Sequence, residues 1–232
     1  MTGIALAAGG AAVPDADTEP APSVSGFDAS DLLARRGRLL PLSADVAAHP
    51  PRGDHLLNPD LFGALTSRRL KDAAVLVPLV DRAGPLSAIL TQRATHLASH
   101  AGQVAFPGGK LDPDDPDPAA AALREAEEEI GLDRGLVEPI GYGAPYLTNS
   151  GYRIFPVVAV VAPTAIVRPN PDEVDAIFEV PWPFLMSPAN HLKASRVWEG
   201  RERFYYRMPF GERLIWGVTA GIVRTLFEQL YD

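Results

Sequence analysis

One segment restricts the possible fold more than any other: residues 117–132, DPAAAALREAEEEIGL, carry the start and stop signals of a single helix. Asp117 is a preferred N-cap residue, and Pro118 fits the first helical position because its missing N–H would be unpaired there. Gly131 suits the position just after the last turn, where a left-handed backbone is common. We therefore predict a helix over 118–130, about 20 Å long.

The predicted helix has an apolar side and an acidic side. At about 100° per residue, four apolar side chains share one face: Ala119, Leu123, Ala126 and Ile130. Three carboxylates form a cluster on the opposite side: Glu125, Glu128 and Glu129. Glu127 falls outside this cluster. Carboxylates at this spacing repel one another, and the last turn of a helix is the unfavourable end for anions. The cluster is therefore either a solvated acidic face or a site for a hard cation such as Mg²⁺ or Mn²⁺.

The sequence before this helix predicts two paired strands and a glycine-rich loop. The run AAVLVPLV at 73–80 is typical of a buried strand, and 85–93 is its antiparallel partner across a DRAG turn. The loop SHAGQVAFPGG at 99–109 then leads through the aspartate-rich segment LDPDDPD into the helix.

The rest of the chain predicts a mixture of strands and helices. Strands are expected at 137–148, 153–163 and 174–182, followed by a hairpin over 192–207. Asp28 can cap a short helix over 31–40, and a second short helix is expected near 61–71. The tail predicts a closing amphipathic helix, on apolar residues at helical spacing: Ile215, Val218, Ile222, Leu226 and Leu230. These elements favour a mixed α/β fold with its sheet between helices.

Composition excludes several classes of function. The net charge of −8 argues against a nucleic-acid binder, although a divalent cation would allow a small phosphorylated substrate. The absence of cysteine excludes disulfides, thiolate zinc sites and cysteine nucleophiles. No apolar run approaches the roughly 18 residues of a membrane span. Residues 1–25 lack the basic start of a signal peptide, so we expect a dispensable, disordered leader, a single domain over 26–232 and a cytoplasmic location.

The helix and the preceding loop together resemble the signature of Nudix hydrolases, G-x5-E-x7-R-E-U-x-E-E-x-G-U, in which U is a bulky apolar residue. Gly109 matches its start, and REAEEEIGL at 124–132 matches its second half. The gap between Gly109 and Arg124 is one residue longer than in the signature, and Ala126 replaces the first bulky residue. The early glutamate is replaced by an aspartate-rich loop: Asp112, Asp114, Asp115 and Asp117.

The stretch at 90–115, LTQRATHLASHAGQVAFPGGKLDPDD, is similar to the additional signature of coenzyme A pyrophosphatases within that family. The matching residues are Leu90, Thr91, Arg93, Ala94, Gly102, Val104, Phe106, Pro107, Gly108 and Gly109. Ala98 stands where an arginine is usual. The closing IWGVTAGIVRTL at 215–226 also resembles this subfamily, so that the likeness covers roughly residues 70–228. It implies the Nudix fold.

The resemblance implies a role for each matching residue. Glu125, Glu128 and Glu129 would hold Mg²⁺ or Mn²⁺, and Glu125, Glu128 and Arg124 would form the catalytic group. Arg124 would pair with and orient one of the glutamates, unless it is a free surface arginine. Gly108 and Gly109 would bring the backbone close to metal or phosphate, where a Cβ would intrude.

Four further side chains have two interpretations each. Arg93 is either a partner for a substrate phosphate or part of a structural ion pair. His96 and His100 could assist, although a lone histidine is more often a packing or loop residue. Glu173 is a candidate general base from a later loop, or an ordinary loop charge.

The first functional hypothesis is a metal-dependent pyrophosphatase that cleaves coenzyme A and its derivatives into adenosine 3′,5′-bisphosphate and 4′-phosphopantetheine. The second keeps the chemistry and changes the substrate to ADP-ribose, a dinucleotide or a nucleoside triphosphate, because Ala98 removes a possible phosphate contact. The third is a nucleotide-sensing Nudix module without activity, against which the three retained glutamates count. Neither nucleic acid nor membrane is an expected partner, and homodimers among relatives leave the oligomeric state open.

Overall fold

The computed structural model describes residues 26–43, 45–61, 63, 67, 69–82, 84–198 and 200–232. The leader predicted at 1–25 lies outside these residues. The helices are α1 (Ala29–Ala34), α3 (Pro118–Ile130), α4 (Trp182–Leu185) and α5 (Val218–Leu230). The first strands are β1 (Arg52–Gly53), β2 (Lys71–Val80), β3 (Ser87–Arg93), β4 (Val104–Ala105), β5 (Gly108–Lys110) and β6 (Val137–Tyr142). The later strands are β7 (Tyr146–Leu147), β8 (Tyr152–Val161), β9 (Val174–Pro181), β10 (Leu192–Trp198), β11 (Arg201–Phe210) and β12 (Arg213–Trp216).

A mixed sheet forms the centre of the molecule. Its strands follow the order β1-β7-β8-β2-β3-β4, while β5 pairs with β2, β6 with β8 and β9 with β3. Strands β2 and β8 run parallel over their whole length, and β3 runs antiparallel to β9. Strands β10, β11 and β12 form a separate antiparallel sheet.

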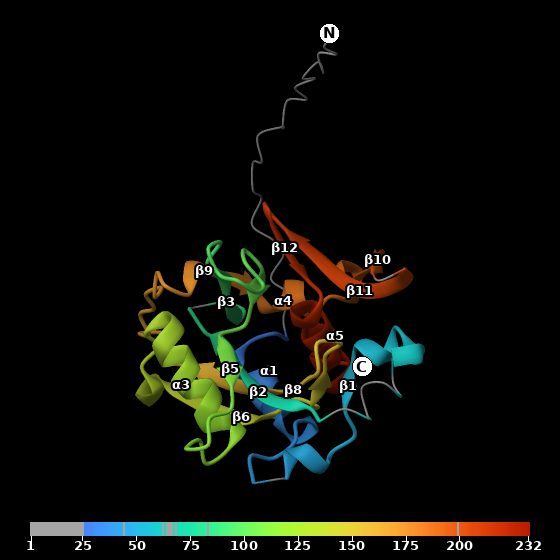
Figure 1. Cartoon of the computed structure of the whole chain (residues 1–232). Helices are drawn as coiled ribbons and strands as arrows, with labels where there is room; N and C mark the ends of the chain where they lie inside the picture. The colour runs from blue at the N-terminus through green and yellow to red at the C-terminus, as the bar shows by residue number, and fades with distance from the viewer. Residues whose placement is uncertain are drawn as a thin grey trace, which may run out of the picture.

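Alternation along the strands divides the core into two layers, one on each side of the sheet. Ala74 and Leu76 of β2 pack with the buried alanines of α3, whereas Val77 and Leu79 pack with α5. Figure 1 shows α3 and α5 on opposite sides of the central strands. The predicted mixed α/β fold, with its sheet between helices, is therefore confirmed.

Three sequence predictions need correction. The closing helix begins at Val218, because residues 213–216 form β12 and pair with β11. Gly217, with a φ of 62°, separates this strand from the helix. The helix after Asp28 ends at Ala34, and a short 3₁₀ turn follows it. The strand predicted at 137–148 is two strands, β6 and β7. The short helix predicted near 61–71 falls largely outside the described residues, although Lys71 itself begins β2.

No helix in the described part of the chain is long and apolar enough to cross a membrane.

Candidate active site

Helix α3 begins and ends as its sequence predicts. The Asp117 carboxylate accepts a hydrogen bond from the Ala120 N–H at 2.8 Å, and Pro118 occupies the first turn. Gly131 adopts a left-handed backbone with φ of 61°, and its N–H caps the last turn. These local signals fix the helix bounds, and the bounds in turn fix the positions of all three clustered glutamates along its axis.

The three glutamates differ sharply in their surroundings. The Glu128 side chain is 54% exposed, that of Glu125 is 17% exposed, and that of Glu129 is only 5% exposed. The expectation that all three lie opposite the buried face is therefore wrong for Glu129. Glu129 points towards strand β5, where its Oε2 accepts a hydrogen bond from the Gly108 N–H at 3.1 Å. The buried face of α3 is also rotated, so that Ala121 and Ala122 are fully buried while Ala119 and Leu123 are half-buried.

The two glycines of the FPGG turn leave space that a larger residue would fill. Both belong to β5, opposite Ala74 and Val75 of β2. A Cβ on Gly109 would lie 2.4 Å from the Glu125 carboxyl carbon, and a Cβ on Gly108 would lie 2.3 Å from the Ala74 carbonyl oxygen. Gly108 also has a φ of 154°, which other residues rarely adopt. Only glycine therefore allows this backbone to touch the carboxylates of α3.

Arg124 connects the aspartate-rich loop to the glutamates. Its guanidinium donates to Asp115 Oδ2 at 3.0 Å, to Glu125 Oε1 at 3.0 Å and to Glu128 Oε2 at 3.1 Å. The hydrogen bond from Arg124 lowers the pKa of Asp115. The sequence analysis named four aspartates in this loop and did not identify which of them contacts Arg124. Asp115 lies six residues after Gly109, at the spacing of the early signature glutamate, and that count was the available signal.

Burial raises the pKa of the two inner glutamates. The pKa of Glu129 rises to about 7 and that of Glu125 also rises, mainly through loss of solvent around each carboxylate. The negative charge of Glu173 raises both further, which places Glu173 in the same electrostatic neighbourhood. A bound cation would stabilise the ionised form of these clustered carboxylates, because it offsets their mutual repulsion.

These residues fit a hard divalent cation by their chemistry. Carboxylate oxygens are the ligands that Mg²⁺ and Mn²⁺ prefer. Among the described residues, no three acidic or histidine side chains are gathered into a finished set of metal ligands. Arg124 donates to Glu125 and Glu128, and the Gly108 N–H donates to Glu129, so that each of the three carboxylates has a hydrogen-bond donor that orients it.

Arg93 lies at the end of β3 and points towards the same cluster. Its Nη1 is 3.6 Å from Glu129 Oε1, and its buried Nε has no hydrogen-bond partner. Both predicted readings therefore retain support: the ion pair is present, and one donor is unused.

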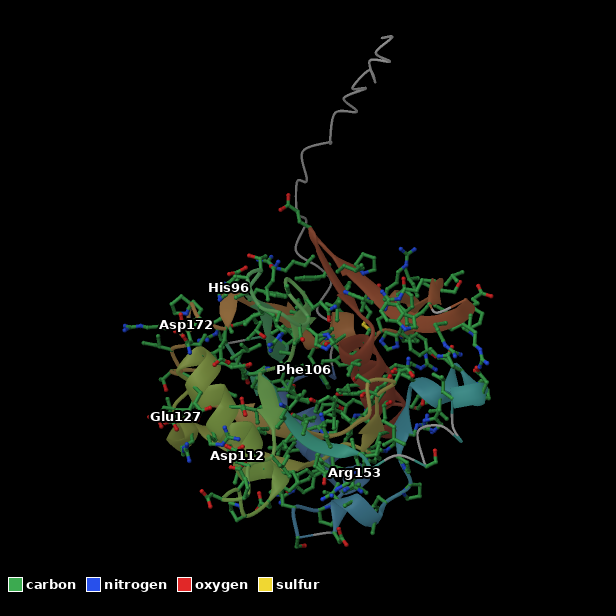
Figure 2. The ribbon with its side chains drawn as sticks, viewed as in Figure 1. His96, Phe106, Asp112, Glu127, Arg153 and Asp172 are labelled. Atoms are coloured by element: carbon green, nitrogen blue, oxygen red, sulfur yellow. The ribbon has the colours of Figure 1, made fainter. Side chains whose placement is uncertain are left out.

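The histidines lie outside the carboxylate cluster. The ring of His96 bonds to the Asp172 carbonyl oxygen at 3.1 Å, and that of His100 bonds to the Gln103 side chain at 2.9 Å. Glu127 pairs with Arg134, away from the cluster, as its position on the helix predicts. In Figure 2, Glu127 lies at the outer edge of α3, with His96 and Asp172 close to one another. Ala98 is exposed in the loop that follows β3.

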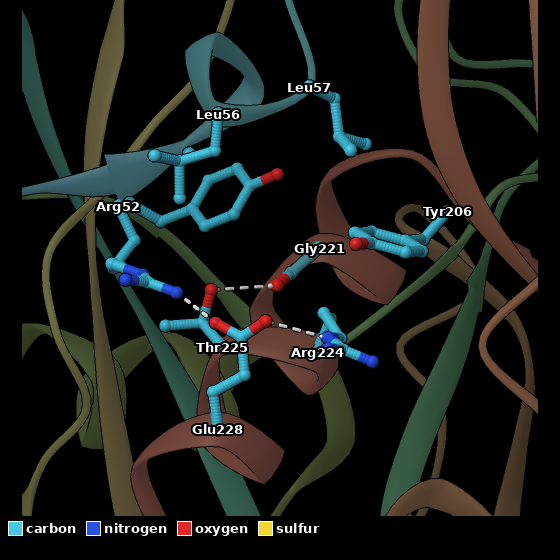
Figure 3. A pocket seen from close by; sticks show the side chains of 10 residues that line it. Arg52, Leu56, Leu57, Tyr206, Gly221, Arg224, Thr225 and Glu228 are labelled. Atoms are coloured by element: carbon cyan, nitrogen blue, oxygen red, sulfur yellow. Dashed lines mark hydrogen bonds and ion pairs between the residues drawn. The ribbon is translucent and has the colours of Figure 1, made fainter. Parts of the chain in front are cut away.

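A cavity of about 260 Å³ lies elsewhere, between β1, β7, β11 and α5. Figure 3 shows Glu228 in this cavity between Arg52 and Arg224, with a 2.7 Å hydrogen bond from Arg224 Nε. None of the residues expected to bind metal or substrate lines it.

Fold and site together define a mixed α/β domain in which a carboxylate-bearing helix packs against a glycine turn. The chain belongs to the Nudix family: it matches the NUDIX domain over residues 70–207. It is therefore a Nudix pyrophosphohydrolase, and Nudix hydrolases generally use divalent metal ions.

Among curated relatives, the chain is similar to the uncharacterized Nudix hydrolase NudL of Yersinia pestis (strain Pestoides F). The two are 39% identical over 180 residues, covering 78% of this chain and 88% of the relative. The NudL of Yersinia pseudotuberculosis (serotype O:1b) is equally similar. Among solved structures, a Caenorhabditis elegans Ap4A hydrolase matches 47% of this chain and 80% of its own, with 21% identity and a TM-score of 0.42.

Proposed function

We propose that this protein hydrolyses the diphosphate bond of coenzyme A and its derivatives, giving adenosine 3′,5′-bisphosphate and 4′-phosphopantetheine. One observation carries the proposal. The residues that match the coenzyme A pyrophosphatase signature end in Gly108 and Gly109, and this turn lies directly against Glu125 and Glu129. The distinguishing motif and the catalytic helix therefore contribute to one surface, where a change in the motif can alter substrate choice.

In the proposed reaction, water adds across the P–O–P bridge: its oxygen bonds to one phosphorus, and the bridging oxygen leaves with the other. Mg²⁺ or Mn²⁺ held by Glu125, Glu128 and Glu129 would neutralise the diphosphate and lower the pKa of the attacking water. Arg124 holds two of these carboxylates in place from the side of Asp115.

Two residues outside the helix complete the proposed machinery. Arg93 lies 3.6 Å from Glu129 through its Nη1, and its partly exposed guanidinium is the candidate partner for a phosphate oxygen. Glu173, which raises the pKa of both Glu125 and Glu129, is the candidate to accept the proton of the attacking water.

Ala98 favours a second candidate, a Nudix pyrophosphatase for ADP-ribose, dinucleotides or nucleoside triphosphates. Its methyl group cannot donate a hydrogen bond to a phosphate, whereas the arginine usual at this position in the subfamily could. A sensing module without activity is the third candidate, and retention of all three glutamates speaks against it.

The test is a substrate panel on the purified full chain. Coenzyme A, dephospho-coenzyme A, ADP-ribose, NADH and diadenosine polyphosphates are each incubated with Mg²⁺ or Mn²⁺, and the products are identified by mass. The expected result is preferential cleavage of coenzyme A into the two named products, which is lost in a Glu128→Gln control. A preference for ADP-ribose would replace the first candidate with the second. Tight nucleotide binding without turnover would support the third.

A further inference from the structure

The pairing of β3 with β9 contains an irregularity beside the candidate active site. Gln92 pairs with Ala176 and Arg93 pairs with Val174, so that Asp175 is an extra residue without a partner in β3. Such a β-bulge bends a strand and changes the direction of neighbouring side chains. Bulges next to active sites commonly serve to aim a side chain.

The bulge determines which residue of β9 enters the core. Ile177 packs towards α3, and regular alternation would direct Asp175 to the same face two residues earlier. Burial of an unpaired carboxylate there would be costly. Instead, Val174 is buried against α3, and exposed Asp175 accepts a hydrogen bond from the Thr95 N–H through Oδ2 at 2.9 Å.

Two more hydrogen bonds tie the same segments together. The Ala94 N–H donates to the Glu173 carbonyl oxygen at 2.8 Å, and the His96 ring bonds to the Asp172 carbonyl oxygen at 3.1 Å (Figure 2). At the other end of this loop, the Asn170 N–H donates to the Glu129 carbonyl oxygen at 2.9 Å. Glu173 therefore lies in a loop fastened both to the end of β3 and to the last turn of α3.

We propose that Asp175 is a positioning residue, which maintains the bulge and thereby holds Glu173 in its place between the end of β3 and the last turn of α3. Of the side chains in these contacts, Asp175 contributes the only carboxylate that joins the described parts of the two segments. A hydrogen bond to a charged acceptor is stronger than a neutral one, so its loss frees the loop more than loss of the His96 contact. The proposal rests on the part of the proposed function in which Glu173 accepts a proton, and not on coenzyme A as the substrate.

The experiment compares five variants of the full chain with Mn²⁺ and the nucleotide diphosphate that the wild type cleaves fastest. In Asp175→Ala, kcat falls about tenfold while KM stays within about twofold, because Asp175 lies outside the residues expected to touch substrate. Asp175→Asn retains most of the activity, since the amide oxygen still accepts from Thr95. Asp172→Ala is the matched control. Asp172 takes part in the His96 contact through its backbone carbonyl, which alanine retains, so this variant is expected to keep the wild-type rate.

The fourth and fifth variants, Glu173→Gln alone and Glu173→Gln combined with Asp175→Ala, complete a double-mutant cycle. If Asp175 acts through Glu173, its substitution has almost no further effect once Glu173 is changed. Fully independent effects, or a wild-type rate for Glu173→Gln alone, would overturn the proposal. So would a thermal midpoint of Asp175→Ala far below that of the wild type, which would give Asp175 a purely structural role. If the wild type does not cleave coenzyme A, the proposed substrate is wrong, and the Asp175 proposal is tested with the nucleotide that the enzyme does cleave.

Discussion

Replacement of Gly109 by alanine tests whether the contact between the glycine turn and helix α3 matters for catalysis. The new Cβ would lie 2.4 Å from the Glu125 carboxyl carbon, whereas ordinary contact begins near 3.4 Å. The carboxylate must therefore move by about 1 Å, and a displacement of that size in a catalytic group can cost about a hundredfold in rate. Because the group displaced is the end of a flexible side chain, stability should change by only about 1 kcal/mol.

Two other glycines provide the comparison. Gly108→Ala would bring its Cβ to 2.3 Å from the Ala74 carbonyl oxygen, at a φ that alanine avoids, and should destabilise the fold by about 3 kcal/mol or more. Gly37→Ala is the matched control, since nothing lies within 4 Å of its Cβ. Thermal melting and steady-state kinetics over a Mn²⁺ titration separate the two effects. A Gly109→Ala enzyme with wild-type kcat and metal dependence would refute the reasoning.

Three further predictions concern the glutamates of α3 and Ala98. Glu128→Gln should lower kcat by orders of magnitude with the fold intact, whereas Glu127→Gln should be mild because Glu127 pairs outwards with Arg134; equal losses in a rate assay would contradict this assignment. Because the folded-state pKa of Glu129 rises to about 7, well above its ordinary value, burial of the neutral carboxyl favours the folded state only at low pH. The thermal midpoint in EDTA should therefore fall as pH rises towards and through about 7, and Glu129→Gln should flatten that slope; an unchanged slope would count against the raised pKa. Ala98→Arg should lower KM for coenzyme A by about ten- to a hundredfold, and less for dephospho-coenzyme A if the 3′-phosphate is contacted. A wild-type KM that is already low and does not move would oppose that prediction.

Local sequence was sufficient for the elements whose signals lie within a few residues. Asp117, Pro118 and Gly131 set the ends of α3 by hydrogen bonds and backbone preferences confined to single turns. The apolar runs of β2 and β3 likewise predicted a buried antiparallel pair. The order Arg-Glu-x-x-Glu-Glu within α3 placed the catalytic candidates along the helix axis without reference to any other element.

Only the tertiary structure decided what each of these residues faces. A helical wheel gives angles about the helix axis, but the position of β5 determines that Glu129 is buried against Gly108. The choice of Asp115 among four aspartates depends on the path of the loop back to Arg124. The bulge at Asp175 depends on the pairing of strands that are far apart in sequence. Contacts between distant segments form when the whole core packs, and no local preference in either segment encodes them.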